Sequence, residues 1–185
     1  MPSGMETLGT TRPYYRSAYA FVTRADRPAI ASFDDPALRS ATVGVQLVGD
    51  KSDTPPARAL ARRGIVGNVR GYSLYGDYAQ PNPPARIVEA VAKGDIDVAV
   101  VWGPLAGYFA PRQDVKLTVT PVEPQVDGPR LPMAFDISVG VRKEDEALRQ
   151  EIGEALARRK PEIDRILASY GVPRLDLPTR VGAVR

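Results

Sequence analysis

The chain has 185 residues, of which 43% are hydrophobic and 25% charged, so it is long enough to bury a core as one domain or two small lobes. It contains no histidine and no cysteine, which excludes disulfide frameworks, thiolate or imidazole catalysis, and zinc sites built on these residues. The net charge is +3. Because the arginines are interleaved with acidic residues and form no basic stripe with aromatics, we expect no nucleic-acid partner.

The sequence shows neither a signal-peptide pattern nor a membrane-spanning stretch. Residues 1–7 have no basic start followed by an apolar run, so we expect no signal peptide in this chain. No stretch reaches the roughly 18 to 20 apolar residues that cross a bilayer, so we expect no membrane span.

In chain order, β-branched and aromatic runs alternate with amphipathic segments. Strands are expected at 18–23, 42–47, 69–75, 97–102, 115–121 and 134–141, and helices at 33–40, 55–63, 84–93, 105–110 and 144–170. This alternation predicts an α/β fold with a mostly parallel sheet and helices on both faces. Sites in such folds form at the carboxyl ends of strands and at helix N-termini.

Several residues mark where these elements end. Gly94 is expected to close the helix at 84–93, and Pro161 to break the long last helix. The segment 121–132 is rich in Pro, Gly and Asp, which predicts a crossing between lobes. The chain after residue 173 is expected to be irregular.

The loop at 49–54 lies between a predicted strand and a predicted helix. Its residues Ser52, Asp53 and Thr54 are placed either to cap the helix, with Asp53 or Thr54 as the N-cap, or to hold a polar or anionic ligand at the helix N-terminus. The spacing is not that of a phosphate-binding Walker loop. We treat these three residues as the rim of a candidate cleft.

Aromatic residues are the most unusual feature of the sequence. An aromatic at the carboxyl end of a strand offers apolar area and one hydrogen-bonding tip, which suits the wall of a cleft. Core packing explains Tyr19 and Tyr72, whereas for the others packing and a cleft both stay open. The candidate cleft residues are Tyr14, Tyr15, Tyr75, Tyr78, Trp102 and Tyr108.

Acidic pairs do not predict catalysis. Asp95 and Asp97 lie at the start of a predicted strand, which is the wrong end for a site, and Asp34 and Asp35 are expected at a helix start. No Ser-x-x-Lys sequence replaces the missing histidine. We therefore expect a protein that is not an enzyme and holds no metal or cofactor.

Three segments resemble the second lobe of a type II periplasmic solute-binding protein: 43–46 (VGVQ), 83–91 (PPARIVEAV) and 94–106 (GDIDVAVVWGPLA). More narrowly, 11–17 (TRPYYRS), 54–57 (TPPA), 75–78 (YGDY) and 102–108 (WGPLAGY) look like the MoxJ and XoxJ type, the solute-binding-type proteins encoded beside quinoprotein methanol dehydrogenases.

The resemblance implies a division of the chain. Members of the family carry a signal peptide and most of a first lobe ahead of the matching region, so we expect a fragment. The expected parts are 1–21 as a remnant of the first lobe and hinge, 22–126 as a complete second lobe, 127–173 as the return to the first lobe, and 174–185 as an irregular tail. A homodimer through the surface that the absent part would cover is a further expectation.

One departure from the amino-acid-binding relatives bears on the ligand. Trp102 stands where those relatives place an acid that grips the ligand ammonium, and the loop at 47–52 is longer than their usual threonine turn. The resemblance therefore implies a cleft for an apolar group or for a peptide or protein segment.

By resemblance, the function is that of a non-catalytic periplasmic accessory protein. It would bind a PQQ-dependent methanol dehydrogenase, calcium- or lanthanide-containing, and help to activate or mature it, with the enzyme's cytochrome c as a second candidate partner. Two alternatives stay open: an ABC-transporter receptor for a small ligand that is not an amino acid, and an enzyme on the same fold.

Overall fold

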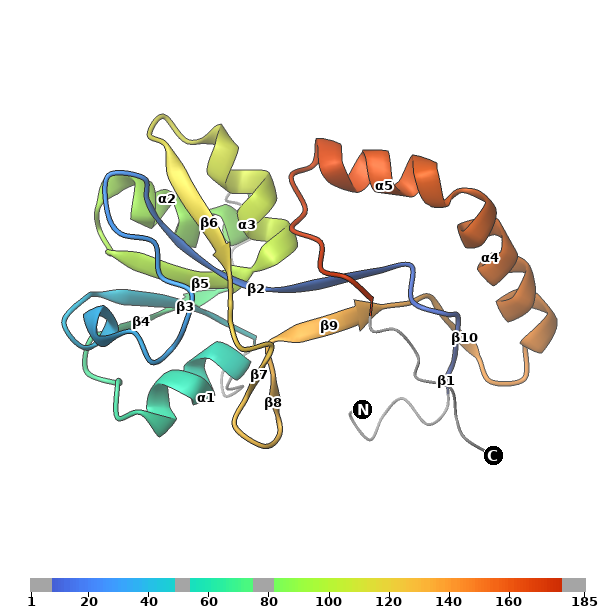
Figure 1. The fold of residues 1–185 in the computed structure, drawn as a ribbon, viewed down its shortest axis with the longest axis horizontal. Coiled ribbons are helices and arrows are strands. Elements are labelled where there is room, and N and C mark those ends of the chain that lie inside the picture. The colour runs from blue at the N-terminus through green and yellow to red at the C-terminus, as the bar shows by residue number, and fades with distance from the viewer. Residues whose placement is uncertain (1–7, 49–53, 75–81, 178–185) are drawn as a thin grey trace.

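The computed structural model describes residues 8–48, 54–74 and 82–177 (Figure 1). The strands are β1 (Leu8–Thr10), β2 (Tyr15–Arg24), β3 (Val43–Leu47), β4 (Val69–Ser73), β5 (Val98–Trp102), β6 (Leu117–Pro121), β7 (Val126–Asp127), β8 (Leu131–Pro132), β9 (Ala134–Ile137) and β10 (Gly140–Arg142). The α-helices are α1 (Pro55–Arg62), α2 (Arg86–Lys93), α3 (Gly103–Phe109), α4 (Glu146–Arg158) and α5 (Lys160–Ser169), and short 3-10 turns lie at η1 (Pro36–Arg39), η2 (Pro83–Ala85) and η3 (Ala110–Arg112). No helix in these ranges is long and apolar enough to cross a membrane.

The central sheet has six strands in the order β4-β3-β5-β2-β6, with β9 also paired to β2. Strand β3 is parallel to β4 and β5, and β2 is antiparallel to β5, β6 and β9. Within this sheet β2 therefore runs against all the other strands, which share one direction. The arrangement confirms the expected α/β fold with a mostly parallel sheet.

Two cores cover the two faces of this sheet. Alternate residues of β5 point to opposite faces, so Val98 and Val100 pack with Phe21 and Leu60 in one core, whereas Ala99 and Val101 belong to the other core. A strand that is buried on both faces must be apolar throughout, and this explains the unbroken run VAVV in β5.

Four expected elements are built differently. The helix expected at 33–40 is only the short 3-10 turn η1. The strand expected at 134–141 is two short strands, because β9 pairs with β2 whereas β10 pairs with β1. The helix expected at 144–170 is broken at Arg159 rather than at Pro161, which is tolerated in the first turn of α5 because that turn needs no amide donor there. The expected crossing at 121–132 contains a small hairpin, β7–β8.

Strand β2 joins the two parts of the molecule. Its residues Tyr15–Ala18 pair with β9, and the following residues from Tyr19 onward pair with β5. In Figure 1 the sheet with α1, α2 and α3 forms one lobe, and α4 and α5 arch away from it with β1 and β10. We call these the large lobe and the small lobe. The boundary expected at residues 21 and 22 falls inside β2, and the division of the chain into domains stays a prediction.

Candidate functional site

An aromatic cluster forms at the point where β2 passes between the lobes. The ring centroids of Tyr19 and Trp102 lie 5.5 Å apart, those of Trp102 and Phe135 lie 5.8 Å apart, and those of Tyr19 and Phe135 lie 6.3 Å apart. All three pairs meet edge to face, which is a favoured geometry for aromatic rings. Each of the three side chains is partly exposed. We call these three residues the aromatic cluster.

Strand register brings the three rings together. Tyr19 of β2 is directly opposite Trp102 of β5, so the two form a cross-strand pair. Phe135 of β9 is opposite Ser17, two residues before Tyr19 on the same face of β2. Burial within this cluster raises the pKa of the Tyr19 hydroxyl, so the group is neutral in the folded protein at ordinary pH.

A buried glutamine supports Trp102 from the neighbouring strand. The side chain of Gln46 in β3 is 2% exposed, and its Oε1 accepts a hydrogen bond of 3.0 Å from the Trp102 backbone N–H. Among the residues that the structure describes, none accepts a hydrogen bond from the Gln46 Nε2. A buried donor without a partner costs free energy, so a hydrogen-bond acceptor placed next to the Gln46 Nε2 would be favourable.

Thr54 was expected at the rim of the cleft, either as a cap or as a ligand contact. It is the N-cap residue of α1, but its side chain makes no capping hydrogen bond. Instead its hydroxyl donates to the carbonyl oxygen of Gln46 at 2.9 Å, and the residue is buried. Thr54 therefore anchors the start of α1 to β3. Ser52 and Asp53 lie outside the described residues.

The structure does not bring Tyr108 to the aromatic cluster. Helix α3 starts directly after Trp102 and carries Tyr108 away from the end of β5. The Tyr108 ring stacks instead on Tyr170, with 5.7 Å between the ring centroids. The Arg112 guanidinium also lies over the Tyr108 ring, with its Cζ atom 3.6 Å from the ring centroid. Tyr108 thus packs between helices.

The remaining cleft candidates lie apart from the cluster or outside the described residues. Tyr14 and Tyr15 contact each other at 5.1 Å at the start of β2. The pKa of Tyr15 is raised by burial and, to a smaller extent, by the neighbouring Tyr14. Tyr75 and Tyr78 lie outside the described residues.

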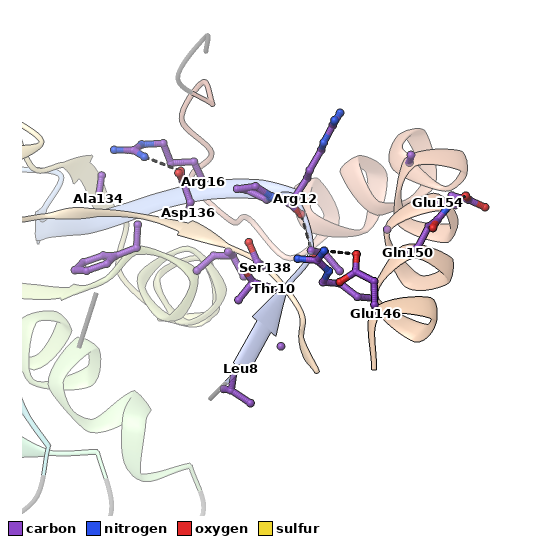
Figure 2. Close-up of a pocket in the computed structure, with 18 of the residues that line it drawn as sticks. Leu8, Thr10, Arg12, Arg16, Ala134, Asp136, Ser138, Glu146, Gln150 and Glu154 are labelled. Carbon is purple, nitrogen blue, oxygen red and sulfur yellow. Dashed lines mark hydrogen bonds and ion pairs between the residues drawn. The ribbon is translucent and has the colours of Figure 1, made fainter. Parts of the chain in front are cut away.

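A groove of about 1390 Å³ lies beside the cluster, between β9 and α4 (Figure 2). Phe135 contributes to its wall and is the one aromatic residue among the described residues that line it. Charged side chains line it as well as apolar ones, including Arg16, which pairs with Asp136 at 2.6 Å. Glu146 and Gln150 of α4 face it from the small lobe. The groove is therefore mainly apolar with charged groups interspersed, and Phe135 rather than a set of tyrosines gives it its aromatic part.

Three of the four acidic residues considered for catalysis, Asp34, Asp35 and Asp97, have structural partners. Asp97 accepts from the Thr42 backbone N–H at 2.8 Å and pairs with Arg27. These contacts hold the pKa of Asp97 below its ordinary value, the Thr42 hydrogen bond being the largest cause.

At the other acidic pair, Asp35 caps η1 by accepting from the Ala37 N–H, and Asp34 pairs with Arg63 at 2.7 Å. The Arg63 guanidinium lowers the pKa of Asp34. Within residues 8–48, 54–74 and 82–177, no group of three or more acidic residues forms a metal site.

Curated relatives match most of this chain. Protein MoxJ of Methylorubrum extorquens is 40% identical over 177 residues, which is 90% of this chain and 58% of that protein. Protein MoxJ of Paracoccus denitrificans is 31% identical over 184 residues, covering 94% of this chain and 65% of that protein. The chain thus spans about three fifths of the length of these relatives. No family model matches it.

A solved structure agrees with them. The crystal structure of the periplasmic binding protein XoxJ from Methylobacterium extorquens superposes with a TM-score of 0.76 at 29% identity, covering 92% of this chain and 74% of that one. The chain is a homologue of the MoxJ and XoxJ type of periplasmic binding proteins. The expected resemblance is confirmed.

Two members of the site were missed at the sequence level. Gln46 carried a signal, because it is a polar residue in an otherwise apolar strand, and such residues usually have a buried partner. Phe135 carried none, since its place depends on the pairing of β9 with β2. Tyr19 was assigned to packing, and the structure places it in the cluster with Trp102.

Proposed function

We propose that this homologue of MoxJ and XoxJ is a non-catalytic periplasmic accessory protein that binds a PQQ-dependent methanol dehydrogenase and helps to activate or mature it. The proposal that the partner is this enzyme rests on the resemblance to proteins encoded beside quinoprotein methanol dehydrogenases. The quinone and the calcium or lanthanide ion belong to the enzyme.

The observation that carries the proposal is the partly exposed cluster of Tyr19, Trp102 and Phe135 beside the groove. Large aromatic side chains are the commonest anchors of protein–protein interfaces, because they bury much area at a small cost in conformational entropy. The mixed charges of the groove next to the cluster supply a polar rim. An apolar anchor with a polar rim suits a protein segment better than a small polar solute.

Chemistry at this site has little support. The chain has no histidine or cysteine, and Asp34, Asp35 and Asp97 are held by structural partners. Binding remains as the activity. A consistent action is that the protein holds a flexible segment of a partly folded dehydrogenase open while its quinone and metal enter, and the enzyme's cytochrome c is a second candidate partner.

Biolayer interferometry, which measures binding of this protein to the apo and holo forms of a PQQ-dependent methanol dehydrogenase, tests this proposal. We expect micromolar or tighter binding that favours the apo form. Trp102→Ala removes the centre of the cluster and should weaken binding at least 30-fold, the loss of a typical interface anchor of about 2 kcal/mol. Tyr72→Ala is the matched control, because it removes a partly exposed aromatic residue of the same lobe that belongs neither to the cluster nor to another contact between the lobes.

Melting curves establish that both variants are folded. A folded Trp102→Ala protein that binds as tightly as the wild type would rule out the cluster as the binding surface. If neither form of the enzyme binds, the accessory function fails. In that case the alternative function, a transport receptor for a small ligand, is tested by measuring melting temperatures with a panel of small solutes. A tightly bound solute would raise the melting temperature.

A further inference from the structure

A third segment crosses between the lobes besides β2 and β9. After α5 ends, residues 170–175 run back from the small lobe across α3 and onto the start of β2 (Figure 1). We call residues 170–175 the strap. The expected irregular tail thus includes an ordered contact, because Leu175 forms an isolated bridge with Arg16.

The strap meets α3 backbone to backbone. A Cβ added to Gly107 would clash with the carbonyl oxygen of Gly171, and it would lie 3.1 Å from the Cδ atom of Pro173. Gly171 itself has a φ of +67°, a left-handed conformation that favours glycine. The two glycines therefore fit each other and leave no space for a side chain.

The same strap is hydrogen-bonded to β2. The hydroxyl of Ser17, which is fully buried, donates to the carbonyl oxygen of Pro173 at 2.6 Å. The backbone N–H of Leu175 donates to the carbonyl oxygen of Arg16 at 3.0 Å. Both β2 residues belong to the part of the strand that pairs with β9, just before the crossing at Tyr19.

Side chains close the two ends of the strap. At its start, Tyr170 stacks on Tyr108 with an angle of 19° between the rings. Near its end, Arg174 pairs with Asp164 of α5 at 2.8 Å. The strap is thereby attached to α3 in the large lobe, to α5 in the small lobe, and to β2 between them.

We propose that the strap locks the angle between the two lobes. Rotation of the small lobe about β2 would have to separate Gly171 from Gly107 or Pro173 from Ser17, because these contacts lie on the two sides of the crossing. The aromatic cluster fills the crossing from Tyr19 to Phe135, so it opposes the same movement. The protein therefore presents one fixed surface and does not close around a ligand. This inference does not depend on the identity of the partner.

The absence of native cysteines makes the lock directly measurable. Spin labels on Ala61→Cys in α1 and Glu151→Cys in α4, both at exposed positions, report the distance between the lobes by double electron–electron resonance. We expect one narrow distance distribution for the otherwise wild-type chain. Gly107→Ala should displace the strap, broaden the distribution at least twofold and speed exchange of the Leu175 amide hydrogen at least tenfold.

Gly153→Ala is the matched control, because it makes the same substitution in a helix of the small lobe where a Cβ meets nothing within 4 Å. It should leave the distribution narrow. Where Gly107→Ala does not fold, the double variant Ser17→Ala and Tyr170→Ala releases the strap without adding atoms and serves the same purpose. A broad distribution in the wild type, or a narrow one in a variant whose Leu175 amide exchanges fast, would overturn the proposal.

Discussion

The two lobes of this protein are stabilised in different ways. The large lobe has a fully buried core on each face of its sheet, with Phe21, Leu38 and Leu60 on one side and Ile87 and Ile96 on the other. Helices α4 and α5 of the small lobe contain no buried residue. Burial of apolar area is the largest favourable contribution to folding, so the large lobe holds most of the stability of the described chain.

The small lobe depends instead on surface pairs and on its connections. Four ion pairs along α4 and α5 join residues three or four positions apart, namely Glu146–Arg149, Glu154–Arg158, Arg159–Glu162 and Lys160–Asp164. Exposed pairs of this kind contribute about 0 to 1 kcal/mol each. Helices α4 and α5 therefore keep their position through the strap and the β1–β10 ladder rather than through a core of their own.

The largest difference between the lobes should appear when one buried or exposed leucine in each lobe is replaced by alanine and the free energies of unfolding are compared. Leu60→Ala empties a site with no exposed area in the core of the large lobe, and we expect it to lower the free energy of unfolding by about 3 to 5 kcal/mol. Leu148→Ala in α4 removes the same atoms from a residue that is 45% exposed, and should cost less than about 1 kcal/mol. Urea unfolding followed by circular dichroism measures both. Equal losses would mean that the small lobe is as tightly packed as the large one.

Ion pairs allow a second comparison between the lobes. Arg63 pairs with the buried carboxylate of Asp127 at 2.7 Å and joins α1 to the β7–β8 hairpin. Arg63→Ala leaves that carboxylate without its main partner, so we expect a loss of about 3 kcal/mol. Arg158 in α4 lies 3.7 Å from Glu154 on the surface, and Arg158→Ala should change stability by less than about 0.5 kcal/mol.

The same unfolding curves read out the arginine variants. The difference between them should hold in 0.5 M salt, because salt screens exposed pairs and leaves buried ones nearly unaffected. A small effect of Arg63→Ala would show that solvent reaches Asp127 once the guanidinium is gone.

Local pattern was enough to predict most of the large lobe. Strands β3 and β5 lie within one residue of their expected bounds, because a sheet covered on both faces requires the apolar runs that the sequence contains. Gly94 ends α2 in a left-handed conformation, as its position in the sequence predicts.

The candidate site was harder to predict because its members come from distant strands. Tyr19 and Phe135 meet through strand pairing across more than a hundred residues, and no local spacing encodes that register. Trp102 and Tyr108 are close in sequence, but the start of α3 between them directs the two rings to different neighbours.

The third pair of variants, which has the smallest expected difference, tests a pH dependence in the large lobe. The pKa of Asp97 is lowered first by the Thr42 N–H and then by Arg27, while partial burial acts in the opposite direction. Because the folded-state pKa lies below the unfolded value, this group stabilises the protein fully above about pH 5, and the contribution is lost as the pH falls through the folded-state pKa. Asp97→Asn should therefore reduce stability by about 1 kcal/mol at pH 7.

The difference between wild type and Asp97→Asn should shrink as the pH falls from about 5 through the folded-state pKa of Asp97, because protonation removes the charge that the Thr42 N–H and Arg27 stabilise. Asp95→Asn is the matched control two residues away, since the exposed Asp95 carboxylate makes no hydrogen bond or ion pair with the described residues. Urea unfolding from pH 7 to pH 2 resolves the two variants. A pH-independent difference would mean that Asp97 acts through shape and hydrogen bonding alone, and that its charge does not help to hold the start of β3 beside β5.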